Sequence, residues 1–150
     1  MKWYSMVLLA ALPLLPIASL AQRIEILPIG HISRVEDRSP TTWAMSGMDM
    51  IRLTQSDSMG TPIMRSLQMD ARTVEILSRT QAPPLRGGDV RVVSRDGHQF
   101  IVVRRYLLVE VLPKDARAEG TSVALLAQRW VRAVRRVLPQ VAPTPNRFGI

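Results

Sequence analysis

The chain has 150 residues, a net charge of +8 and no cysteine. The absence of Cys excludes disulfide bonds and lipid attachment through an amino-terminal cysteine, so the hydrophobic core alone must hold the fold. Apolar residues make up 47% of the chain, a normal share for a globular protein.

Residues 1–21 have the order of a cleavable secretory signal peptide. Lys2 gives a positive start, Met6 to Ala18 is uncharged and mostly apolar, and Ser19-Leu20-Ala21 places small residues at positions −3 and −1 of a cut. The apolar run is shorter than the about 20 residues that span a membrane. We therefore expect a secreted or periplasmic protein that is not integral to the membrane after cleavage.

The mature chain is basic, and its positive charge is almost all arginine. Removing residues 1–21 leaves 129 residues with 19 basic and 12 acidic side chains, a net charge of +7, and 18 of the basic side chains are Arg. Such a balance is typical of proteins that bind nucleic acid, acidic polysaccharide or anionic lipid, but the arginines are scattered along the whole chain, which favours side chains that are simply solvated. No nucleic-acid-binding motif is visible, and export argues against that role.

Residues 22–60 predict an extended arm with one or two short strands, because Pro and Gly interrupt the stretch repeatedly. Met50–Thr54 is the clearest strand candidate within it. Residues 63–69 alternate weakly as a strand would. Asp70 then fits as the N-cap of a helix over Ala71–Thr80, although a strand through residues 73–76 competes with that interpretation.

The second half of the chain has sharper patterns. Residues 89–94 predict a strand, and Asp96-Gly97 predicts a hairpin turn because both residues tolerate positive φ. Residues 99–112 are β-rich but long for one strand, so we expect a bend or bulge near Arg104-Arg105. His98 should lie in the turn, in contact with solvent.

Two helices should follow. Residues 114–119 predict a helical turn, and Thr121 or Ser122 should cap a long helix that ends at Leu138, before Pro139. Its apolar face is centred on Trp130. The face comprises Val123, Leu126, Ala127, Trp130, Val131, Val134, Val137 and Leu138.

The predicted fold class is α+β, with an antiparallel sheet of three to five strands packed against one dominant C-terminal helix and a shorter helix. The predicted organisation is a signal peptide over residues 1–21, an arm over 22–60, an α+β domain over 61–138 and a Pro-rich tail over 139–150.

Four short motifs carry a resemblance. They are Leu107-Leu108-Val109-Glu110-Val111, Asp115-Ala116, Gly120-Thr121 and Leu126-Ala127-Gln128-Arg129-Trp130. With them, residues 62–138 resemble small secreted proteins of cyanobacteria that have no assigned activity. The same residues are similar to the extracytoplasmic segment that precedes the membrane helices in some cyanobacterial MscS-type mechanosensitive channels, including the spacing of Arg72, Ile76 and Arg79 in an earlier helix. The resemblance implies an extracytoplasmic α+β module, not a channel, because no channel helices follow it, and it implies no catalytic residue.

Two groups of side chains are candidate binding sites. On the predicted long helix, Arg129, Arg132, Arg135 and Arg136 lie opposite Trp130 with no acidic residue among them, a pattern that fits an anionic partner or a solvated outer face. In the arm, Met45, Met48 and Met50 offer thioether sulfur, a soft ligand for Cu(I), or fill gaps in a core.

The favoured function is a small exported, non-enzymatic envelope protein, a binding or accessory module for another cell-envelope component. The partner would be an envelope protein, an anionic lipid or an acidic polysaccharide, and no cofactor is expected. One alternative is a periplasmic Cu(I)-handling protein that uses the Met cluster. A second is a hydrolase whose site does not show in the sequence, which has no HExxH, GxSxG, phosphate-loop or dinucleotide motif.

We predict that the mature protein begins at Gln22, because Ser19-Leu20-Ala21 follows the apolar run. Intact-mass analysis of protein recovered from the producing cell measures this directly. A mass that retains residues 1–21 would contradict the predicted export.

Overall fold

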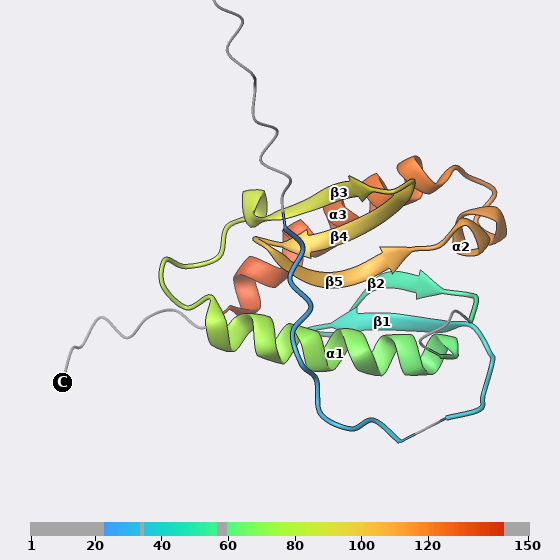
Figure 1. Ribbon diagram of the computed structural model, residues 1–150, viewed down its shortest axis with the longest axis horizontal. Helices are drawn as coiled ribbons and strands as arrows, with labels where there is room; N and C mark the ends of the chain where they lie inside the picture. Colours follow the sequence, from blue (N-terminus) through green and yellow to red (C-terminus); the bar gives the residue numbers. More distant parts are fainter. Residues whose placement is uncertain (1–22, 34, 57–59, 143–150) are drawn as a thin grey trace, which may run out of the picture.

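The computed structural model describes residues 23–33, 35–56 and 60–142. Its described part has two antiparallel sheets, one of two strands and one of three, and two long helices (Figure 1). The predicted α+β class is therefore confirmed. The predicted signal peptide and most of the predicted tail lie outside the described residues. Within those residues, no helix is long and apolar enough to cross a membrane.

The stretch predicted as an arm contains a β-hairpin that packs into the core. Strands β1 (Thr41–Met45) and β2 (Met48–Leu53) are joined by Ser46-Gly47, both with positive φ. A register shift after Trp43 leaves Met50 as the extra residue of a bulge, so Met50 and Ile51 are both buried. The predicted strand Met50–Thr54 overlaps β2 and is confirmed in that part, whereas its pairing with β1 was not predicted.

The three-stranded sheet follows the predicted hairpin. Strand β3 (Val90–Arg95) turns at Asp96-Gly97 into β4 (His98–Val103), as predicted. The long β-rich run divides at Arg104-Arg105, but by a two-residue turn into β5 (Tyr106–Val111) and not by a bend. The amino-terminal segment joins the free edge of β5, where Glu25 pairs with Tyr106 in a parallel bridge.

Helix α1 spans Pro62–Arg79, so the predicted strand over residues 63–69 and the Asp70 N-cap are wrong. Thr61 is the N-cap, since its side chain accepts a hydrogen bond from the amide of Met64, and Pro62 begins the first turn. The error has a physical reason. The buried side of α1 carries polar residues at helical spacing, and a search for apolar periodicity misses such a face. These buried polar residues are Arg65, Gln68, Arg72 and Thr73.

The chain ends in two further helices, α2 (Pro113–Ala118) and α3 (Val123–Val141). The Ser122 side chain accepts a hydrogen bond from the amide of Leu125 and is the predicted cap. Helix α3 does not end at Leu138 but continues through Pro139. Because Pro139 lies in the last turn, its missing amide removes a hydrogen bond only at the end of the helix.

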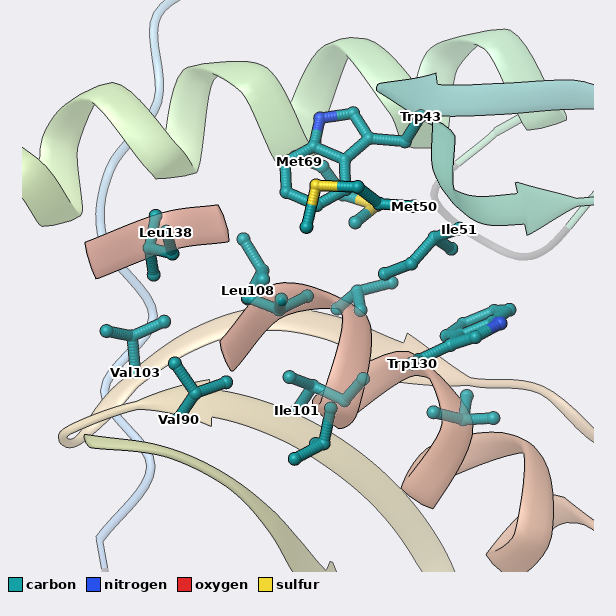
Figure 2. Close-up of a cluster of buried hydrophobic side chains, with 14 of the residues drawn as sticks. Trp43, Met50, Ile51, Met69, Val90, Ile101, Val103, Leu108, Trp130 and Leu138 are labelled. Atoms are coloured by element: carbon teal, nitrogen blue, oxygen red, sulfur yellow. The ribbon is translucent and has the colours of Figure 1, made fainter. Parts of the chain in front are cut away.

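The core lies between α3, the three-stranded sheet, the hairpin and α1 (Figure 1). Trp130 is 3% exposed, as the predicted apolar face requires. Figure 2 shows Trp43, Met50 and Met69 grouped beside α1, with Leu108 between this group and the residues of β3 and β4. The hairpin is thus part of one continuous core.

A buried ion pair connects four elements. Arg65 Nη2 lies 2.8 Å from Asp115 Oδ2, and the two side chains are 3% and 0% exposed. Asp115 Oδ1 also accepts hydrogen bonds from the amide and hydroxyl of Thr54, both at 3.1 Å, and from the amide of Gln55 at 3.2 Å. Arg65 donates to the carbonyls of Gln55 and Glu110. The pair therefore ties α1 and α2 to β5 and to the end of β2.

Replacing Trp130 by Ala should lower the free energy of unfolding by about 3–5 kcal/mol, because the indole is buried in the core. Urea unfolding measures the loss. Leu125→Ala on the same helix is the control, since Leu125 is 64% exposed and should cost no more than about 0.5 kcal/mol. Equal losses in the two variants would contradict the described orientation of α3.

Asp115→Ala should destabilise the fold by about 3–5 kcal/mol, because it leaves Arg65 buried without its carboxylate. The matched control is Glu75→Gln, which breaks the exposed Glu75–Arg79 pair and should cost no more than about 0.5 kcal/mol. Arg65→Met combined with Asp115→Ala should lose less than the sum of the single losses. Simple additivity in urea unfolding would show that the two side chains do not interact.

Candidate functional site

The four arginines predicted as a binding face lie along the exposed side of α3, opposite Trp130. Two of them have partners. Arg129 Nη1 lies 3.3 Å from Glu119 Oε2, so the view that no acid neutralises this face is wrong for Arg129. Arg135 Nε donates to the carbonyl of Val90 at 2.7 Å. Arg132 and Arg136 are exposed on the same face.

The three methionines of the Cu(I) hypothesis occupy different surroundings. Met45 and Met48 are register partners beside the β1–β2 turn, where Met45 is half-buried and Met48 is exposed. Met50 lies in the core with Met69 and Trp43 (Figure 2). Its burial fits gap filling in the core. Among the described residues, no group of three or more His, Cys, Asp or Glu side chains could hold a metal ion.

A cavity of about 390 Å³ gathers four arginines from three distant parts of the chain. We call it the arginine cleft. The end of α1 and the short 3₁₀ helix η1 (Gly87–Asp89) provide Arg79, Thr80, Gly88 and Asp89. The sheet provides Arg91, Arg104, Arg105 and Tyr106. The cleft lies where η1, the β4–β5 turn and the carboxyl end of α1 meet (Figure 1).

Backbone contacts fix the β4–β5 turn at the cleft. Arg104 has φ of 56°, a left-handed conformation that costs a non-glycine residue about 1–2 kcal/mol. Its amide donates to the carbonyl of Asp89 at 2.6 Å, and its carbonyl accepts from Arg91 Nη2 at 2.9 Å. These bonds join the turn to Asp89 at the end of η1 and to Arg91 at the start of β3.

Two arginines form the more buried part of the cleft. The Arg104 guanidinium donates to the carbonyl of Pro83 and lies 3.7 Å from Asp89 Oδ2. Arg91 has no acidic partner among the described residues, and its Nε is buried without a hydrogen-bond partner there. Of these two arginines, only Arg104 therefore has a carboxylate beside it among the described residues.

The other two arginines stand at the rim, each beside a carboxylate. Arg79 Nε lies 3.1 Å from Glu75 Oε2 and Arg105 Nε lies 2.7 Å from Glu25 Oε2, with the arginines 46% and 65% exposed. Arg105 also covers the ring of Tyr106 at 5.0 Å. Tyr106 first, and then Glu25, hold the pKa of Arg105 above its ordinary value.

This arrangement suits the binding of an anion. A concave site lined by one sign of charge concentrates its field more than a flat surface does. Guanidinium groups match carboxylate and phosphate oxygens in pairs of parallel hydrogen bonds. The lining side chains include one carboxylate, Asp89, and no His, Cys, Lys or Ser. The lining is therefore dominated by groups that bind anions.

A second hollow, of about 320 Å³, lies on the sheet face that α3 does not cover. It is mainly apolar and is lined by Ile24, Ile26, Arg95, Asp96, His98, Phe100 and Leu107. His98, predicted as a solvated turn residue, is the first residue of β4. Its Nδ1 lies 2.6 Å from Glu110 Oε1.

The sequence analysis missed the arginine cleft. One local signal was present: Arg104-Arg105 occupies a two-residue turn, where Asn, Asp and Gly are the usual residues. Arg79 and Arg91 could not be added to it, because only the fold brings the end of α1 and the start of β3 to this turn.

Comparisons of the chain with protein-family models, with curated proteins and with solved structures give no match. The resemblance of residues 62–138 to cyanobacterial secreted proteins and channel segments therefore stays a prediction.

Proposed function

We propose that this protein is a small exported, non-enzymatic envelope protein that binds an anionic envelope component through the arginine cleft. One observation carries the proposal: Arg79, Arg91, Arg104 and Arg105 line a single cavity although they come from separate elements. The predicted signal peptide and the net charge of +7 of the predicted mature chain support an anionic partner outside the cytoplasm.

The cleft is a better primary site than the α3 face. On α3 the arginines lie in a row on a convex surface, where each contributes about 1 kcal/mol near an anionic membrane. In the cleft, Arg91 and Arg104 are held in place before a ligand arrives, and such preorganisation lowers the entropic cost of binding. Arg132 and Arg136 then serve as supplementary contacts.

Changing both Arg91 and Arg104 to Gln should abolish binding to acidic polysaccharide or to anionic vesicles, because both central cations of the cleft are lost. Cosedimentation with each material measures binding. The matched control is Arg132→Gln with Arg136→Gln, which removes the same charge from the exposed face of α3. Binding by the parent should weaken from 0.1 M to 1 M salt, since the Debye length falls from about 10 Å to about 3 Å.

Circular dichroism and urea unfolding establish that each variant is folded. If the folded Arg91/Arg104 variant binds like the parent, the cleft is not the site. If the Arg132/Arg136 variant loses binding instead, the α3 face is the site. If the parent protein sediments with only one of the two materials, that material identifies the partner as polysaccharide or lipid.

A further inference from the structure

The lining of the arginine cleft excludes the apolar part of a ligand. No aliphatic side chain lines the cavity, whose one aromatic residue, Tyr106, is covered by Arg105. The apolar contacts left for an acyl chain are those with the arginine stems, which are few beside the polar groups of the lining. The volume of about 390 Å³ is near the lower end of the roughly 300–1,000 Å³ range of small-molecule sites. The cleft fits one compact, hydrophilic group.

The position of Asp89 indicates that the bound group also carries a hydroxyl. Its Oδ2 accepts the amide of Arg86 at 2.8 Å, and no described residue donates to its Oδ1. A site for bare phosphate gains nothing from a carboxylate beside its cations, because like charges repel. A hydroxyl group, by contrast, donates to a carboxylate in a charge-assisted hydrogen bond. The arginines can bind an anionic group, and Asp89 beside them can accept a hydrogen bond from a hydroxyl. Together they match a ligand that carries both groups.

We propose that the ligand of the arginine cleft is an acidic sugar, a hexose unit that bears a carboxylate or a phosphate. Arg91 and Arg104 hold the anionic group, and Asp89 accepts a sugar hydroxyl. The proposal rests on the function proposed above and names the ligand class of the same site.

The rim carboxylates compete with the ligand. Glu25 and Glu75 occupy Arg105 and Arg79, and both pairs are exposed, so each exchanges readily. An arriving sugar acid gains a further arginine only by displacing one of these carboxylates. Removing the negative charge of Glu25 therefore leaves Arg105 available and strengthens binding.

Isothermal titration of the mature protein with glucuronate, glucose 6-phosphate, glucose and inorganic phosphate tests the ligand class. Either sugar acid should bind at least about tenfold more tightly than glucose or inorganic phosphate, which is the effect of one additional charge-assisted bond. Arg91→Gln and Asp89→Asn should each weaken sugar-acid binding, and Arg91→Gln should do so more. Glucuronate against glucose 6-phosphate distinguishes a carboxylated sugar from a phosphorylated one.

Two variants that change the net charge equally test whether Glu25 competes with the ligand for Arg105. Glu25→Gln should raise the affinity for the sugar acid about threefold, since one competing exposed carboxylate is removed. Glu119→Gln changes the net charge equally but releases Arg129 on α3, away from the cleft, and should leave the affinity unchanged. Equal gains in both variants would show that only overall charge matters and would overturn the proposal.

Inorganic phosphate that binds as tightly as glucose 6-phosphate would also overturn it, as would the absence of binding by either sugar acid. These outcomes are separate from the function test. A protein that sediments with envelope polymer through Arg91 and Arg104 but binds no sugar acid keeps the proposed function and loses this inference. A protein that binds the sugar acid but no envelope material keeps the inference and loses the function.

Discussion

The buried Arg65–Asp115 pair is the constraint on which the rest of the structure depends. The Asp115 carboxylate is fully buried. A buried carboxylate is stable only while donors surround it, so Arg65, Thr54 and Gln55 must all face Asp115. That requirement fixes α2 against the end of β2 and fixes α1 across both. In a chain without cysteine, this connection joins segments far apart in the sequence, as a disulfide does in many small proteins.

The same polar face of α1 also positions the arginine cleft. Seven residues beyond Arg65, Arg72 Nη1 donates to the carbonyl of Leu108 at 3.0 Å, which holds α1 along β5. Seven residues beyond Arg72, Arg79 reaches the cleft, beside the turn that begins β5. Residues seven apart lie on one side of a helix after two turns. Arg65 and Arg72 thus fix the rotation of α1 about its axis, and this rotation places Arg79 at the arginine cleft.

The elements that could be predicted are those whose signals are local or apolar. Asp96-Gly97 predicts its turn because both residues tolerate positive φ. The Ser122 cap and the apolar face around Trp130 predict α3. The first half of α1 was missed because its buried side carries the polar residues Arg65 and Gln68, which do not appear as apolar periodicity. The strand at Met50–Thr54 was predicted and overlaps β2, but its pairing with β1 in a hairpin was not, because the bulge at Met50 breaks strand alternation. The cleft could not be predicted, since its arginines meet only in three dimensions.

The three tight turns differ in a way that bears on function. Two of them, Ser46-Gly47 and Asp96-Gly97, have glycine as the second residue, whereas the third has Arg105 there. The first residue has a positive φ in all three turns, and at 56° Arg104 adopts it with a residue type that such turns do not favour. Arg104 instead directs its guanidinium to Pro83 and Asp89 beside Arg91. Strain at one residue, offset by the bonds that fix it, is the arrangement expected where side-chain chemistry outweighs local stability.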